Sequence, residues 1–152
     1  MKFRKHHARA ARVTATLAAT VGLVLAVGLA PASAHPLDNT DPGATGCSSG
    51  SSSIYSRTIY SGGTAIGLME VRYSPSCGTN WVRVNNYGYY PRAGKLIYVA
   101  PSGAYNYTGD SYVGWSYGMQ VYAPGSTCIN VEGTIRNSSD AVVGTTGVIQ
   151  LC

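Results

Sequence analysis

From Cys47 to the C-terminus, short runs rich in Val, Ile, Thr and Tyr alternate with clusters of Gly, Pro, Ser and Asn. The first kind of residue favours strands, the second favours turns, and no stretch repeats its apolar positions with a helical period. The pattern predicts about seven strands. They are expected near residues 53–60, 65–73, 81–87, 95–100, 112–122, 127–136 and 141–151. Regularly spaced short strands are typical of an all-β fold, a single small antiparallel sandwich or barrel without an internal domain boundary.

The second and third expected strands specify their own pairing register. If Tyr73 pairs with Asn80, apolar side chains share one face of the hairpin and polar side chains share the other. The apolar face is Met69, Val71, Val82 and Val84, and the other face is Glu70, Arg72, Trp81 and Arg83. On this second face we expect an ion pair between Glu70 and Arg83 and a cation–π contact between Arg72 and Trp81. A shift by one residue would disrupt both faces, so the register is strongly determined.

The fifth expected strand, residues 112–122, also alternates between two kinds of side chain. Val113, Trp115, Tyr117, Met119 and Val121 alternate with Tyr112, Gly114, Ser116, Gly118 and Gln120. The first set is large and apolar, and the second is mostly small or polar. We therefore expect the first set to face the core.

The first 34 residues predict a cleaved signal peptide. Basic residues precede an apolar stretch at 17–30, and Ala32-Ser33-Ala34 forms an A-x-A cleavage site ahead of His35. The apolar stretch is short for a membrane span, which needs about 20 residues, although an uncleaved anchor is the alternative. The expected organisation is a signal peptide at 1–34, a flexible N-terminal arm at 35–46 and a disulfide-linked β domain at 47–152. We expect a secreted protein, extracellular or associated with the cell surface, without membrane attachment after cleavage.

The charge of the mature chain limits its partners. The whole chain has 11 Lys and Arg against 6 Asp and Glu, but five of the basic residues lie in the signal peptide. The mature part therefore has six of each sign and a net charge near zero. Proteins that bind nucleic acid gain most of their affinity from many Lys and Arg contacts to phosphate. The mature chain has too few basic residues for this, so nucleic acid is not an expected partner. An extracellular protein or a cell-wall glycan fits this charge better. The oligomeric state is left open.

All the cysteines lie in the mature part, at Cys47, Cys77, Cys128 and Cys152. An even count in an exported chain predicts a disulfide framework, which here has three possible connectivities. We favour pairing in chain order, Cys47 with Cys77 and Cys128 with Cys152. Zinc is disfavoured because no C-x-x-C pair exists and His35 is the only mature histidine. No metal or other cofactor is expected.

Two sequence motifs resemble a known family. Residues 41–47 read D-P-G-A-T-G-C, and residues 70–84 read E-V-R-Y-S-P-S-C-G-T-N-W-V-R-V. Together with V-Y-A-P-G at 121–125, these motifs are similar to the YjfA family of uncharacterised proteins exported by Gram-positive bacteria. The resemblance covers most of residues 41–128 and implies that Cys47 pairs with Cys77. It implies no activity.

The residues offer little for catalysis. A Ser-His-Asp arrangement would need His35, on the expected arm, and oxidised cysteines are not nucleophiles. A small secreted hydrolase using Glu70 and Glu132 is a minor alternative, because glycosidases use paired carboxylates. Asp38, Asn39 and Asp41 suggest a calcium site, but they lack the spacing of a calcium loop, and turn formation explains them.

Tyrosine is the one residue in excess, with 12 in the chain, all of them mature. Several fall in segments that resemble loops, at 85–90 and 102–110. The candidate binding residues are Tyr87, Tyr89, Tyr90, Tyr105 and Tyr107. Tyr, Ser, Gly and Asn on loops over a rigid scaffold are typical of binding surfaces. We expect a non-catalytic binding or assembly module that engages an extracellular protein or wall glycan through these loops or through the arm. The alternatives are an adaptor or structural component of an exported complex, or surface tyrosines without a ligand.

Overall fold

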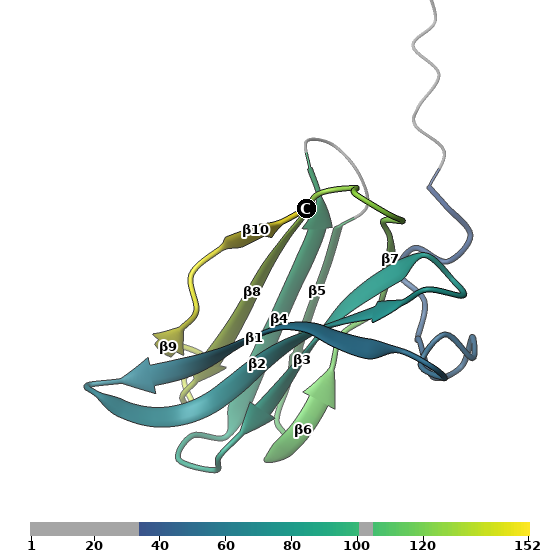
Figure 1. Cartoon of the computed structure of the whole chain (residues 1–152). Helices are drawn as coiled ribbons and strands as arrows, with labels where there is room; N and C mark the ends of the chain where they lie inside the picture. The colour runs from purple at the N-terminus through teal and green to yellow at the C-terminus, as the bar shows by residue number, and fades with distance from the viewer. Residues whose placement is uncertain (1–33, 101–104) are drawn as a thin grey trace, which may run out of the picture. The chain divides into compact units, whose positions relative to one another are not determined.

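The computed structural model describes residues 34–100 and 105–152, which form two antiparallel sheets packed face to face (Figure 1). The first sheet contains β1 (Ser52–Ser61), β2 (Thr64–Ser74), β3 (Thr79–Asn86), β6 (Gly114–Tyr117) and β7 (Val121–Tyr122). The second contains β4 (Arg92–Val99), β5 (Tyr105–Asp110), β8 (Ile129–Arg136), β9 (Val142–Thr145) and β10 (Ile149–Leu151). The described residues contain no helix. The fold is the all-β sandwich that the sequence predicts.

Strand order places β5 at one edge of the second sheet. The first sheet runs β1-β2-β3-β6, and β7 pairs with β3 beyond the end of β6. The second runs β10-β8-β4-β5, and β9 pairs with β8. The β1–β2 ribbon runs across the second sheet in Figure 1. Because β5 pairs only with β4 among the described strands, its side chains border an open edge.

The predicted register of β2 and β3 is confirmed. Tyr73 pairs with Asn80, and Glu70 pairs with Arg83. The apolar side chains of this pair are buried and form part of the single core cluster. That cluster contains Ile59, Ile66, Met69, Val71, Val82, Val84, Ala93, Ile97, Val121, Ala123, Ile129, Val131 and Ile135. The two inner sheet faces therefore meet in one apolar core cluster, as in other sandwiches.

The prediction for residues 112–122 is wrong in two respects. The segment is not one continuous strand, and its large side chains at 113–117 do not face the core. Two strands, β6 and β7, replace it, and the backbone between Gly118 and Gln120 is irregular. Trp115 and Tyr117 are 40% and 48% exposed, and Val113 is also exposed. The interruption changes the phase of the alternation: Val121 after it is buried in the core, whereas the large residues before it point outward.

Two other expectations about strands are also wrong. Residues 105–110, expected as a loop, form β5 because they pair with β4 from Tyr98–Tyr105 to Ala93–Asp110. The expected strand at 141–151 is divided into β9 and β10, separated by irregular backbone at 146–148.

Residues 35–46 do not form a free arm but pack against β7 (Figure 1). Asn39 donates its N–H to Gln120 O at 2.9 Å, and the Gln120 N–H donates to Thr40 O at 3.0 Å. The buried Gln120 side chain donates to Thr40 Oγ1 at 2.8 Å and to Thr45 Oγ1 at 2.9 Å. These bonds satisfy a buried amide, which makes the segment part of the β domain.

Both disulfides follow the chain order: Cys47 is bonded to Cys77, and Cys128 to Cys152. Disulfides persist in oxidising compartments, so the domain belongs to such an environment. The signal peptide expected at 1–34 lies, apart from Ala34, outside the described residues. Within residues 34–100 and 105–152, no helix is long and apolar enough to cross a membrane.

Candidate binding site

The five candidate tyrosines fall into two groups. Tyr105 and Tyr107 lie on β5, at the edge of the second sheet. Tyr87, Tyr89 and Tyr90 lie in the connection between β3 and β4. Four of the five tyrosines are exposed, and Tyr90 is the exception. The sequence pattern places all five in loops, whereas Tyr105 and Tyr107 lie on a strand.

Tyr105 and Tyr107 are two residues apart on β5 and therefore project from the same face. They are 59% and 44% exposed. Each has a partner on β4: Tyr105 pairs with Tyr98, and Tyr107 pairs with Leu96. The rings of Tyr98 and Tyr105 stack, with centroids 6.3 Å apart. The outer face of the second sheet thus carries a row of aromatic rings on a rigid support.

The ring of Tyr107 lies across two glycines of the neighbouring backbone. A Cβ at Gly94 would come within 2.8 Å of Tyr107 Oη, and a Cβ at Gly109 within 3.3 Å. The absence of side chains at both positions lets the ring lie low over the sheet. Arg136 Cζ stands 5.7 Å from the ring centroid, within cation–π range. These contacts fix the orientation of an exposed ring.

Two shallow grooves meet at Tyr107 and Arg136. The first, of about 390 Å³, is lined by Arg92, Ala93, Tyr107, Gly109, Asp110, Ser111, Arg136 and Asp140. The second, of about 330 Å³, is lined by Gly94, Leu96, Tyr105, Tyr107, Glu132, Thr134 and Arg136. We name the surface formed by Tyr98, Tyr105, Tyr107, Glu132 and Arg136 the tyrosine face. It combines ring faces with hydrogen-bonding groups along one side of the molecule.

The charged groups on this face are held by neighbours. Glu132 accepts a hydrogen bond from Thr145 Oγ1 at 2.6 Å. Arg136 donates to Asp140 O at 3.1 Å, and Arg92 lies 3.4 Å from the Asp140 carboxylate. Each group still has donors or acceptors available, since a carboxylate accepts several hydrogen bonds and a guanidinium donates five.

The second group of tyrosines forms an apolar tip. Tyr87 and Tyr89 are 45% and 64% exposed. The tip also includes Tyr112 and Val113, because Asn86 Nδ2 joins the two loops by donating to Tyr90 O and Tyr112 O. The Tyr90 side chain does not belong to this exposed group: it is half-buried and packs against the core.

A third hollow lies on the outer face of the first sheet, where residues 41–47 and 70–84 meet. Its volume is about 230 Å³, and its lining is Pro42, Gly43, Ser48, Ser51, Arg72, Trp81, Arg83 and Tyr117. The ion pair of Glu70 and Arg83 is present, with 2.6 Å between Oε2 and Nη2.

The cation–π contact expected between Arg72 and Trp81 is wrong. Arg72 Nη2 donates to Ser51 O at 2.7 Å and to Ser51 Oγ at 2.9 Å, which draws the guanidinium toward the residue that precedes β1. Arg83 instead stacks on a tryptophan: its Cζ lies 4.2 Å from the ring centroid of Trp115 on β6. The sequence pattern does not predict this contact, because it places Trp115 on the core face of its strand, whereas the side chain is exposed.

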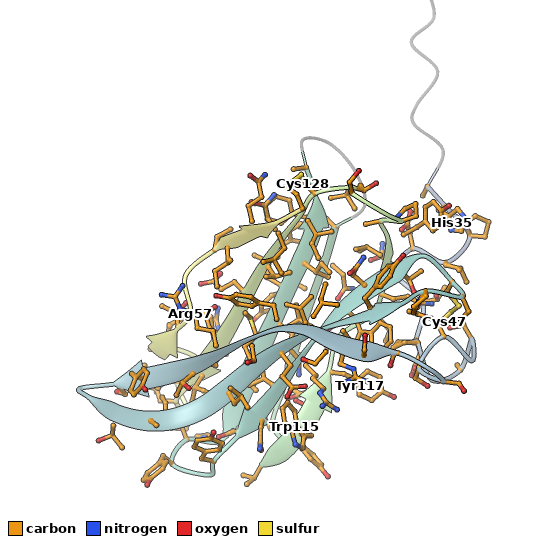
Figure 2. The ribbon with its side chains drawn as sticks, in the orientation of Figure 1. His35, Cys47, Arg57, Trp115, Tyr117 and Cys128 are labelled. Carbon is orange, nitrogen blue, oxygen red and sulfur yellow. A yellow bond between two sulfur atoms is a disulfide. The ribbon has the colours of Figure 1, made fainter. Side chains whose placement is uncertain are left out.

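Tyr117 links this hollow to the N-terminal segment. Its hydroxyl donates to the Asp41 carboxylate at 3.4 Å, and both Trp115 and Tyr117 project from β6 (Figure 2). The negative charge of Asp41 raises the pKa of Tyr117, with a smaller contribution from burial. Asp41 Oδ1 also accepts the Gly43 N–H at 2.6 Å. Asp41 therefore performs the turn-forming role that its sequence position suggests.

Glu70 and Glu132 do not lie together. Met69 and Val71 point into the core from β2, as do Val131 and Ile135 from β8, so both glutamates point outward from opposite sheets. Packed sheets are about 10 Å apart, and here the two carboxylates lie on the outer sides of both. The structure therefore does not bring these two carboxylates together as a catalytic pair.

The interior contains a lysine, Lys95, whose burial no sequence pattern predicts. The Lys95 side chain is 0% exposed; it forms an ion pair with Asp110 and donates to Ser116 Oγ at 2.8 Å. Ser116 Oγ donates to Asp110 Oδ1 at 3.1 Å. Burial lowers the pKa of Lys95, and the hydrogen bond and charge of Asp110 partly oppose this effect. The network joins β4 and β5 of one sheet to β6 of the other.

No three side chains of His, Cys, Asp or Glu cluster for a metal within residues 34–100 and 105–152. Asp38 instead accepts the Tyr122 N–H at 2.7 Å through Oδ1. Asn39 adopts a positive φ of 57°, as turn residues do.

Comparison with known proteins gives one match. Residues 35–146, from the N-terminal segment through the β9 strand, match the family described as "Protein of unknown function (DUF2690)". The chain belongs to the DUF2690 family. The match begins at His35, and the DUF2690 domain therefore includes the segment that packs on β7. No curated protein and no solved structure matches the chain.

Proposed function

We propose that this DUF2690 protein is a secreted, non-catalytic binding module that holds a cell-wall glycan on its tyrosine face. The observation that carries the proposal is the placement of Tyr105 and Tyr107 on one face of β5, beside Glu132 and Arg136. Two exposed rings on a rigid strand can stack against the apolar faces of sugar rings. Carboxylate and guanidinium groups beside them can bond the hydroxyls at the sugar edge.

The form of the grooves supports a polymer as the ligand. Both are open and meet at Tyr107, so a chain can lie along the face without its ends being enclosed. Polar and aromatic groups alternate across the surface, which suits a ligand with both hydroxyl edges and apolar ring faces. The near-zero charge of the mature chain favours a neutral glycan over a polyanion.

Sequence motifs and the signal sequence extend this proposal, and the apolar tip favours a second candidate function. The motifs at 41–47 and 70–84 support placing the protein with the YjfA family of exported Gram-positive proteins. The signal peptide pattern supports secretion, and binding to wall glycan would then retain the protein at the cell surface. The apolar tip at Tyr87, Tyr89, Tyr112 and Val113 supports a second candidate, an adaptor or structural component that contacts an extracellular protein.

Co-sedimentation with insoluble cell-wall glycan tests the proposal. The Tyr105→Ser/Tyr107→Ser variant should bind about tenfold more weakly, because each lost ring contact is worth about 0.5–1.5 kcal/mol. The matched control is Tyr60→Ser/Tyr89→Ser, which removes two exposed rings away from this face and should bind as the unmodified protein does. Loss of binding in the control pair alone would instead assign binding outside the tyrosine face.

A further inference from the structure

The first residues of the expected mature chain form a compact turn on β7 (Figure 2). His35 N lies 2.7 Å from Asp38 Oδ2, and Asp38 N–H donates to His35 O at 2.8 Å. His35 Nδ1 accepts the Leu37 N–H at 3.2 Å. The main-chain nitrogen of His35, its imidazole Nδ1 and the Asp38 carboxylate are therefore all engaged within one turn of four residues.

Two contacts to Tyr122 hold these groups in place. The imidazole of His35 stacks on the Tyr122 ring, with centroids 3.6 Å apart and planes 10° from parallel. Asp38 Oδ1 accepts the Tyr122 N–H at 2.7 Å, which leaves Oδ2 directed at His35. Outer partners of this kind orient the ligands of metal sites.

Signal cleavage changes the chemistry of this turn. The A-x-A pattern predicts cleavage between Ala34 and His35. The His35 main-chain nitrogen then becomes a free α-amine, a basic donor that the uncleaved chain lacks. The amine and Nδ1 of one histidine can bind one metal ion together, and Asp38 can supply an oxygen.

We propose that the mature N-terminus is a Cu²⁺ site formed by the His35 α-amine, His35 Nδ1 and Asp38 Oδ2. Mixed nitrogen and oxygen donors suit Cu²⁺, which also binds most tightly among the divalent first-row metals. The ion takes the place of the proton on the amine and of the Leu37 N–H at Nδ1, since a metal binds the deprotonated ligands. The inference rests on cleavage before His35 and is independent of the tyrosine face.

Cu²⁺ titration of the secreted protein tests this site, with competition against a chelator for affinity and electron paramagnetic resonance for the donor atoms. Intact mass first establishes that the chain begins at His35. We expect one Cu²⁺ per chain and a spectrum with nitrogen donors. A matched protein with Gly-Ser-Gly-Ser placed before His35 keeps every side chain but lacks the free amine at His35, and its affinity should fall by at least about 100-fold. Four added residues are used because histidine in the third position of a chain would itself form a square-planar nitrogen site for Cu²⁺. Asp38→Asn, which retains an oxygen for the Tyr122 N–H, should weaken binding roughly tenfold.

A peptide of residues 35–40 separates a built site from the general affinity of any N-terminal histidine. The folded protein should bind Cu²⁺ at least about tenfold more tightly than this peptide, because Tyr122 orients the ligands only in the fold. Equal affinity of the protein and the peptide, or of the mature and extended proteins, would overturn the proposal. The turn would then be only an ion pair between the mature amine and Asp38.

Discussion

The Arg83 guanidinium lies over the indole of Trp115, with 4.2 Å between Cζ and the ring centroid. Glu70 fixes it there, because its Oε2 accepts from Arg83 Nε at 2.8 Å and lies 2.6 Å from Nη2. One arginine thus joins β2, β3 and β6 across the outer face of the first sheet.

A double-mutant cycle on Arg83→Met and Trp115→Leu should give a coupling free energy of about 0.5–1 kcal/mol, as expected for a partly exposed cation–π contact. Urea unfolding of the four proteins provides the values. The same cycle on Arg72 and Trp81 is the matched control and should show no coupling within error, since Arg72 bonds to Ser51. Coupling in the control with none in the first cycle would contradict these side-chain positions.

The register of β2 and β3 was predictable because it depends on neighbouring residues alone. Three successive pairs, Met69–Val84, Glu70–Arg83 and Val71–Val82, carry matching apolar or charged partners across a single loop, and a shift by one residue would break them all. The position of Arg72 was not predictable in this way. Its partner, Ser51, belongs to a segment whose position on the sheet depends on long-range contacts.

The strand β5 and the phase of β6 could not be obtained from local patterns. Tyr105–Asp110 contains Asn, Gly and Asp, which favour turns, and it becomes a strand only because β4 offers a partner. Large and small side chains do alternate along β6 as predicted. The irregular backbone before Gln120 shifts this alternation, so the large side chains of β6 face outward, whereas Val121 after the break faces the core. The tyrosines were therefore found by composition, whereas their grouping required the fold.

Removal of residues 35–46 should destabilise the domain. The deletion leaves the buried Gln120 amide without Thr40 and Thr45, and each unsatisfied buried group costs about 1–3 kcal/mol. Chemical unfolding should show a lower midpoint than that of the unmodified protein. Ala44→Ser, at an exposed position of the same segment, is the control and should leave the midpoint unchanged. An unchanged midpoint in the deletion would restore the idea of a free arm.

Lys95 should make stability depend on pH in the alkaline range. Burial lowers its pKa in the folded protein, whereas in the unfolded chain lysine titrates near 10.4. Between these two values the unfolded chain binds more protons than the folded one, so the free energy of unfolding rises with pH. Lys95→Met should remove this rise in urea unfolding.

The raised pKa of Tyr117 has the opposite effect on stability. The folded protein then retains a proton that the unfolded chain releases, so stability falls as the pH passes about 10, where free tyrosine titrates. The Lys95 comparison is therefore made below that pH. An equal pH dependence in the protein and in Lys95→Met would show that another group is responsible.

Amide chemical-shift mapping tests the binding account most directly. The mature protein, labelled with ¹⁵N, is titrated with neutral oligomers of N-acetylglucosamine, and the shifts are followed by residue. We predict saturable changes on β4, β5 and β8 around Tyr105, Tyr107 and Arg136, with little change at Tyr87 and Tyr89. Saturable shifts confined to the apolar tip or to the hollow beside Arg72, or no shifts at millimolar sugar, would contradict a glycan site on the tyrosine face.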